Sequence, residues 1–108
     1  LNAGARLGVL GAPLPLPSPQ ALAAMTVCLL DVEGQEIEAA PGTAILSHPL
    51  QAALWLARDL AAAGIPLRKG DLLSLGAYSR PRQPVPGSGA TVVYEGLPGN
   101  PRVNLRFR

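Results

Sequence analysis

The sequence predicts a small α+β or mostly-β fold in which one principal amphipathic helix, over about residues 48–63, packs on a curved sheet. Three observations predict it. One segment has the apolar spacing of a helix, with residues that typically start a helix at one end and residues that end it at the other. Several short strand-forming runs are separated by turns. Twelve Gly and twelve Pro residues in 108 imply many turns and argue against a helical bundle.

Length and composition predict one domain with one modest core, spanning residues 1–108. Hydrophobic residues make up 48% of the chain, so it is too apolar to be disordered. Aromatic residues are only 4%, so the core must be built from Leu, Val, Ile and Ala.

Charge and cysteine content limit the classes of partner and the cellular compartment that are expected for this chain. The formal net charge is +2, and no Lys/Arg stripe is interleaved with aromatics, so nucleic-acid binding is not expected. Cys28 is the single cysteine and cannot form an internal disulfide, which favours a reducing, cytoplasmic setting. No apolar run reaches the roughly 18 residues that a membrane span needs. The start at Leu1, without Met or a basic signal region, suggests a fragment or a processed or trimmed chain.

The first half is expected to contain strands and turns. Residues 6–10 are predicted as a strand, and the proline-rich residues 12–19 as an extended connection. Residues 25–40 are predicted as a β-hairpin that turns at Glu33-Gly34, and Pro41-Gly42-Thr43 as a second turn.

The central helix has signals at both ends. Pro49 suits the first turn, and Ser47 or His48 occupies the capping position. Gly64 ends the helix, and Pro66 prevents it from resuming. The expected buried stripe follows the i, i+3, i+4, i+7 spacing: Leu50, Ala53, Leu54, Ala57, Leu60 and Ala61.

The last third is expected to add three strands. Leu72 to Leu75 is predicted as a buried strand, and residues 79–89 as a basic Pro/Gly loop. Residues 90–95 and 103–107 are predicted as two strands joined by residues 96–101.

Two polar features have functional alternatives. Glu36 and Glu38 are spaced to face the same side of a strand, where they could bind Mg²⁺. The solvated face of a hairpin gives the same spacing, and this interpretation is favoured because nothing places a third ligand nearby. His48 could act as a base, but such a residue more often caps the helix.

The residues alone do not define a complete active site. No nucleophile–base pair, phosphate-binding glycine loop or Cys/His metal spacing is present. Cys28 lies in an apolar run, where thiols are usually inert packing groups. The catalytic residues therefore remain unassigned.

Three stretches around the central helix carry a family resemblance: LSHPLQAALWLA at 46–57, GIPL at 64–67 and GDLL at 70–73. They resemble the C-terminal part of the 2-keto-4-pentenoate hydratases. These belong with the 4-oxalocrotonate decarboxylases to the fumarylacetoacetate hydrolase-like superfamily, whose pattern is L-G-[HN]-P-L-N-A-x-x-W-L-A, then G-x-P-L-x-x-G-D-I-I-L-T-G. The resemblance extends over essentially all 108 residues.

The resemblance implies a mixed β-roll with flanking helices and a lyase acting on 2-oxo (di)enoic acids in aromatic catabolism. It also implies a divalent cation, Mg²⁺ or Mn²⁺, as a Lewis acid. The carboxylates that bind this metal in the family lie upstream of the matching part, so no metal ligand is expected in this chain.

Several positions depart from the pattern. The family's Asp-Asn-[Ala/Gly]-Ser corresponds to Leu1–Gly4, so Gly4 lacks a serine hydroxyl, and the family's Thr-Gly corresponds to Leu75-Gly76. The resemblance implies that Asn2, Leu75 and Gly76 line a substrate pocket, with His48 nearby as support.

Two functions follow as expectations. The chain is either part of a hydratase-like lyase whose N-terminal half is missing or supplied by another chain, or an inactive relative serving as a binding or assembly subunit. Activity of this chain alone is not expected under either. Half a β-roll would expose edges and apolar faces, which predicts a homo-oligomer or a heteromer. A stand-alone β domain of unrelated role is the third hypothesis.

Overall fold

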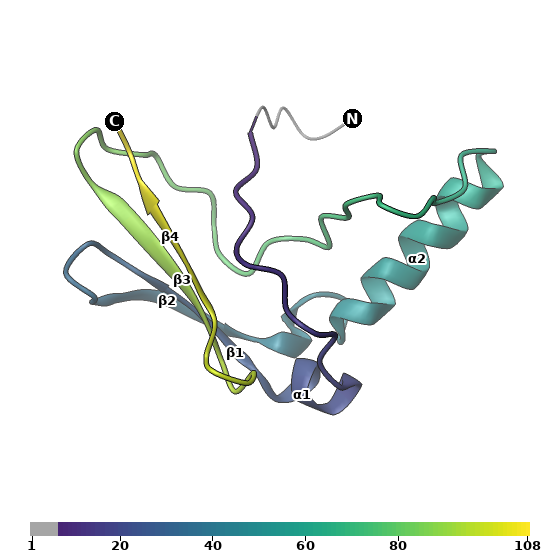
Figure 1. The fold of residues 1–108 in the computed structure, drawn as a ribbon, viewed down its shortest axis with the longest axis horizontal. Coiled ribbons are helices and arrows are strands. Elements are labelled where there is room, and N and C mark those ends of the chain that lie inside the picture. The colour runs from purple at the N-terminus through teal and green to yellow at the C-terminus, as the bar shows by residue number, and fades with distance from the viewer. Residues whose placement is uncertain (1–6) are drawn as a thin grey trace.

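A computed structural model describes residues 7–108 (Figure 1). The described part is an α+β fold, as predicted. Its elements, in chain order, are α1 (Pro19–Ala24), β1 (Thr26–Leu30), β2 (Glu36–Pro41), the 3₁₀ helix η1 (Gly42–Ala44), α2 (Pro49–Ala62), β3 (Gly89–Glu95) and β4 (Arg102–Arg106). The predicted hairpin and the two last strands are thereby confirmed.

The four strands form one antiparallel sheet in the order β2-β1-β3-β4. Each hairpin places two strands side by side, and the pairing of β1 with β3 joins the two hairpins across a long stretch of sequence. The β1–β2 register is regular from Thr26↔Pro41 to Leu29↔Glu38 and then shifts, because Leu30 pairs with Glu36. Such a bulge places an extra residue on one strand and turns its side chains.

The core lies where α1 meets the sheet. Met25, Val27 and Leu97 are buried together, and partly buried side chains from α1, β3 and the coil before β3 surround them: Ala21, Leu22, Tyr78, Val92 and Tyr94. Gly42 allows this close packing, because a Cβ there would lie 1.9 Å from the Leu22 carbonyl oxygen. The core predicted from composition contained only Leu, Val, Ile and Ala, whereas the observed core includes Met25 and packs against Tyr78 and Tyr94.

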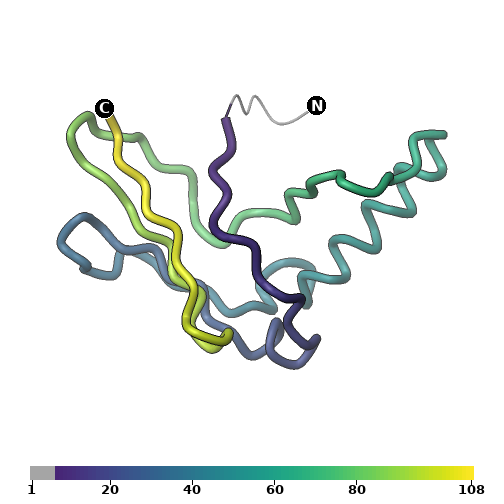
Figure 2. Tube along the Cα trace, viewed as in Figure 1, coloured from purple at the N-terminus to yellow at the C-terminus, as the bar shows by residue number. Residues whose placement is uncertain are grey.

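Helix α2 begins and ends as predicted. His48 caps it, Pro49 occupies its first turn, and Gly64 follows it with a φ of +78°. Its main contacts are with α1 and η1, and it projects away from the sheet (Figures 1 and 2). Only Pro49 and Ala52 are buried. The expected packing of the helix on the sheet is not seen within residues 7–108, where no strand is among the elements that the helix mainly contacts.

The expected buried stripe of α2 is also largely open. Leu50 and Leu54, which belong to that stripe, are exposed, together with Trp55. The side of α2 that contacts α1 and η1 instead includes the buried Pro49 and Ala52. Each of them lies one residue before a member of the predicted stripe. The apolar residues of α2 occupy so much of its circumference that their spacing alone could not show which side would be buried.

Two predicted strands are not strands in this structure. Leu72 to Leu75 is coil, with Leu72 exposed, because no strand edge among residues 7–108 pairs with it. Residues 7–10 are also coil, and Arg6 lies outside the described part. Helix α1 was not predicted, although Ser18 caps it and Pro19 starts it. The proline-rich run before it is typical of an extended connection, and the predicted connection therefore included Pro19.

No helix within residues 7–108 is both long enough and apolar enough to cross a membrane.

Candidate functional site

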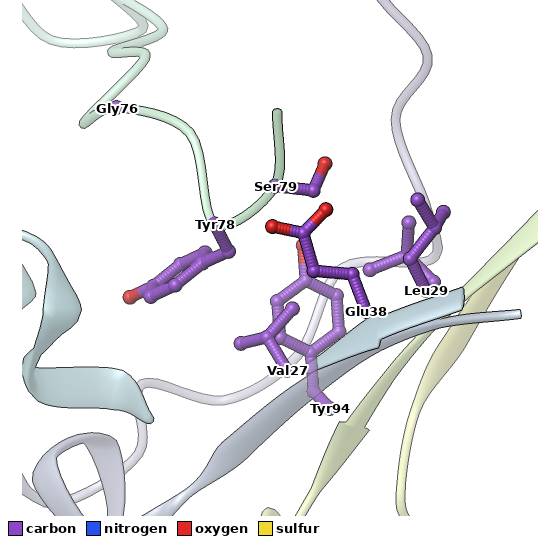
Figure 3. Close-up of a pocket in the computed structure, with 8 residues that line it drawn as sticks. Val27, Leu29, Glu38, Gly76, Tyr78, Ser79 and Tyr94 are labelled. Carbon is purple, nitrogen blue, oxygen red and sulfur yellow. The ribbon is translucent and has the colours of Figure 1, made fainter. Parts of the chain in front are cut away.

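A hollow of about 170 Å³ lies where the coil before β3 passes over one face of the sheet (Figure 3). Strands β1, β2 and β3 supply its floor, and the coil supplies Gly76, Tyr78 and Ser79. Eight residues line it: Val27, Leu29, Glu38, Gly76, Tyr78, Ser79, Val92 and Tyr94. An apolar floor with one carboxylate and three hydroxyls is suited to a small, partly polar molecule.

The bulge in β2 separates the two carboxylates that sequence spacing placed on one face. Glu38 pairs with Leu29 and lines the hollow. Glu36 pairs with Leu30 and approaches Cys28, which lies on the opposite face. The i, i+2 rule fails here because the register shifts between the two residues. Glu36 and Glu38 are therefore not a pair of metal ligands.

Glu38 is held as a carboxylate. Its Oε2 lies 2.8 Å from Arg82 Nη2 and accepts a 3.4 Å hydrogen bond from the backbone N–H of Arg80. The hydrogen bond from Arg82 is the main reason that the pKa of Glu38 lies below its ordinary value. Glu38 thus acts as an acceptor of hydrogen bonds, and it ties the coil to the edge strand β2.

Tyr78 fixes the other side of the hollow. Its hydroxyl donates a 3.3 Å hydrogen bond to the Gly42 carbonyl, linking the coil to η1. Burial, with a smaller effect from Tyr94, raises the pKa of Tyr78 above its ordinary value. The phenol therefore stays protonated and remains a donor.

His48 lies at the start of α2 and uses both ring nitrogens within the chain. Nδ1 accepts a 3.1 Å hydrogen bond from the Leu50 N–H, and Nε2 lies 2.8 Å from the Pro19 carbonyl oxygen. Because an N–H donates to Nδ1 and a carbonyl faces Nε2, this geometry requires the neutral imidazole with its proton on Nε2. The structure thus places His48 as the helix cap, apart from the residues that line the hollow.

The residues implied by the resemblance are only partly brought together. Gly76 lines the hollow with a φ of +136°, and a Cβ placed on it would lie 3.4 Å from Ile45 Cδ1. Leu75 is half-buried next to it and is not among the lining side chains. Asn2 and Gly4 lie outside the described residues. Tyr78, Ser79 and Tyr94 were not predicted as site residues, although Tyr78 and Ser79 lie two and three positions after Gly76.

Within residues 7–108 no three His, Cys, Asp or Glu side chains gather into a possible metal site. Glu38 is bound to Arg82, and Asp31 accepts hydrogen bonds from the backbone N–H groups of Glu33 and Gln35. The carboxylates of the described residues therefore do not gather into the ligand set that a divalent cation requires.

A second, larger hollow of about 580 Å³ adjoins the first and shares Leu29, Ser79 and Val92 with it. The end of the sheet and the Pro-rich coil form its walls, which are mostly apolar. They include Ile37, Pro84, Val85, Leu105 and Phe107. The two hollows together leave one face of the sheet incompletely covered.

No protein-family model matches this sequence. Individual proteins do. A 2-keto-4-pentenoate hydratase of Paraburkholderia phymatum is 38% identical over 97 residues, which are 89% of this chain and 36% of the relative. A 2-keto-4-pentenoate hydratase of Paraburkholderia xenovorans is 37% identical over 76 residues, 70% of this chain and 28% of the relative. The TodF product hydratase of Pseudomonas putida F1 is 44% identical over 59 residues, 55% of this chain and 22% of the relative.

A solved structure agrees with these relatives. The 4-oxalocrotonate decarboxylase of Pseudomonas putida G7, in complex with calcium and acetate, superimposes with a TM-score of 0.68 at 31% identity. The superposition covers 82% of this chain and 32% of the decarboxylase.

The chain is thus homologous to enzymes of the fumarylacetoacetate hydrolase-like superfamily. Within it, the homologues are the 2-keto-4-pentenoate hydratases and the 4-oxalocrotonate decarboxylases, as the motif around the central helix predicted. The chain spans between about a fifth and about a third of the length of these relatives.

Proposed function

We propose that this chain forms part of a 2-keto-4-pentenoate hydratase-like lyase that acts on 2-oxo enoic acids. The observation that carries the proposal is the agreement of sequence and fold: 38% identity to a hydratase over nearly the whole chain, and a TM-score of 0.68 to a decarboxylase. The hollow beneath Tyr78 and Ser79 would contribute one wall of the substrate site.

The remaining wall and the metal would come from polypeptide outside this chain, either joined to it or as a separate subunit. The decarboxylase was solved with calcium, which supports a divalent cation in the family. We propose Mg²⁺ or Mn²⁺ for the assembled enzyme, held by carboxylates that this chain does not contribute. When bound, such an ion polarises a 2-oxo acid as a Lewis acid. We also propose a reducing, cytoplasmic setting, which the single cysteine favours because it cannot form a disulfide within the chain.

A second candidate function is a catalytically inactive relative that binds or assembles with other subunits. One observation favours it: Leu75 and Gly4 stand where the family pattern has hydroxyl residues. Loss of both hydroxyls would leave the substrate site of the assembled enzyme more apolar and weaken its hold on a substrate carboxylate.

The test is a chimera in which the part of the P. phymatum hydratase that this chain does not match is joined ahead of this chain. Hydration of 2-keto-4-pentenoate with Mg²⁺ is then measured. We expect turnover by the chimera and none by the hydratase part alone. A chimera carrying Leu75→Thr is the matched variant, and a restored hydroxyl should increase kcat/KM.

A folded chimera that does not turn over in either form would contradict the lyase proposal and favour the inactive relative. Cooperative unfolding of each chimera, followed by circular dichroism, provides the folding control.

A further inference from the structure

The coil between α2 and β3 dips toward the sheet at one place. From Gly76 to Gly87 only Tyr78 and Ser79 are half-buried, and every other residue is exposed. Both line the smaller hollow, and Ser79 also lines the larger one, so it lies where the two hollows meet. A hydroxyl at this junction can form hydrogen bonds with a polar group of a bound molecule. The position of the coil therefore decides where this hydroxyl lies in the site.

Few hydrogen bonds hold the coil in this position. Among the described residues, three side chains or N–H groups join residues 72–84 to the rest of the chain, those of Tyr78, Arg80 and Arg82. Tyr78 donates to η1, whereas the other two both donate to Glu38 Oε2. Ser79 thus lies between a hydrogen bond to η1 on one side and two to Glu38 on the other.

The bulge in β2 directs Glu38 toward the coil. The register of β1 and β2 shifts beside it, so that Glu38 lines the hollow while Glu36 approaches Cys28 on the opposite face. Bulges next to functional sites often re-aim a side chain in this way. Figure 3 shows the Glu38 carboxylate pointing away from its strand and toward the coil at Ser79. The paired strand is thus a firm base from which Glu38 holds the coil.

The contact of Glu38 with the coil affects position more than stability. The side chains of Arg82 and Glu38 are 46% and 27% exposed, and ion pairs this exposed contribute little to stability in general. The Arg80 N–H and the Arg82 guanidinium nevertheless reach the same carboxylate oxygen, which fixes the coil at two points just after Ser79.

We propose that Glu38 is a positioning residue of the substrate site and that it acts through the Ser79 hydroxyl. By accepting from Arg80 and Arg82, Glu38 keeps the coil in one position over the sheet, so that the hydroxyl is placed to hydrogen-bond a 2-oxo enoic acid. A group that is already in place need not be ordered when the substrate binds. This inference rests on the proposed function, because it takes the hollow as one wall of the lyase site.

The contact between Glu38 and the coil is tested on this chain alone. The Arg80 N–H donates to the Glu38 carboxylate, so its NMR signal should shift as acid protonates Glu38. The shift should be absent from Glu38→Ala and retained in Glu36→Ala, because Glu36 lies on the same strand but approaches the opposite face. An Arg80 signal that responds equally in both variants would overturn the contact and the proposal with it.

The role in the reaction is tested with the chimera described above. Glu38→Ala and Ser79→Ala should each lower kcat/KM roughly tenfold, because small displacements of a group that contacts substrate are costly. The double variant should lose little more than Ser79→Ala alone, since Glu38 acts through Ser79. Glu38→Gln keeps an acceptor for the coil and should lose less. Glu36→Ala is the matched control and should leave kcat and KM unchanged. Unfolding of each chimera, followed by circular dichroism, is the folding control.

The outcomes separate this inference from the lyase proposal. Losses that multiply in the double variant would show that Glu38 acts independently of Ser79, and would overturn the positioning role. An active chimera whose kcat/KM is unchanged by Glu38→Ala would also overturn it and leave the lyase proposal standing. A folded wild-type chimera without turnover would contradict the lyase proposal itself, and the role of Glu38 in the reaction would fall with it, whatever the Arg80 signal shows about the contact.

Discussion

His48 links two parts of the chain that are 29 positions apart, because its ring caps α2 and also reaches the carbonyl of Pro19. Replacing it with Ala removes both hydrogen bonds and should lower the free energy of unfolding by about 1–2 kcal/mol. His48→Asn can still cap the helix but cannot reach Pro19, so its loss should be smaller. Urea unfolding of the three proteins measures the order. Equal stability of His48→Ala and the wild type would contradict a structural role.

The Glu38–Arg82 ion pair makes stability depend on pH. Because the pKa of Glu38 is lowered in the folded chain, its contribution is fully present above the ordinary value of 4.5 and is lost as pH falls through the folded pKa. Arg82→Gln should therefore be less stable than the wild type near neutral pH, and the difference should shrink in acid. Unfolding free energies measured over a pH series give this difference.

Arg68→Gln is the control for this pH series, because Arg68 lies in an exposed turn and its side chain forms no ion pair within residues 7–108. It should show no such pH-dependent difference. A constant gap between Arg82→Gln and the wild type down to acid pH would contradict the assigned role of Glu38.

Cys28 should be a poor nucleophile in the folded chain. It is 3% exposed, and burial together with the nearby Glu95 and Glu36 carboxylates raises the pKa of its thiol. A thiol reagent at mildly alkaline pH should react with the native chain roughly 100-fold more slowly than with the chain in urea. Comparable rates in both states would show that β1 opens readily.

At the scale of elements, most of those whose determinants are local could be predicted from the sequence, and α1 is the exception. Pro49 and Gly64 define the ends of α2, and Glu33-Gly34 lies in the turn of the first hairpin, so these elements were placed correctly. The bulge that separates Glu36 from Glu38 depends on the register of two strands, which no local pattern specifies. The hollow likewise depends on a coil crossing strands distant in sequence, so Tyr78 and Tyr94 could not be paired in advance.

The junction of α1 with η1 depends on Gly42. A methyl group there would lie 1.9 Å from the backbone oxygen of Leu22, so Gly42→Ala must push α1 away from the core. We expect a loss of about 1–3 kcal/mol in the free energy of unfolding, the usual cost of overpacking. Gly8→Ala is the matched control, since nothing lies within 4 Å of its added methyl, and it should leave stability unchanged. Thermal and urea unfolding of both variants measure the effect.

At the scale of the molecule, residues 7–108 are more open than a self-sufficient domain. The radius of gyration is 15.0 Å, whereas a compact chain of this length has about 13 Å. The accessible surface is 8421 Å², about one and a half times the roughly 5,600 Å² expected for a folded monomer of this mass. The excess is of the size that obligate interfaces bury. Large apolar side chains contribute to it on the outward side of α2, in the coil before α1 and in the coil between α2 and β3.

The outward side of α2 should therefore affect association more than folding. Trp55 is 61% exposed and Leu54 is 43% exposed, so the double variant Leu54→Gln, Trp55→Gln loses few contacts within the chain. Its free energy of unfolding should change by no more than about 0.5 kcal/mol per site. Its binding of an apolar dye and its self-association in sedimentation should both fall, because apolar patches of this kind promote association.

Val93→Ala is the matched control for this double variant, because Val93 is 4% exposed and lies within the sheet. It should lower the free energy of unfolding by about 1–3 kcal/mol without reducing dye binding by the folded chain. The double variant removes apolar area that is exposed in the described chain, whereas Val93→Ala removes apolar area that is already buried. A large loss of stability in the Leu54, Trp55 variant would show that α2 packs against the rest of the chain in solution, and the surface excess would then have to lie elsewhere.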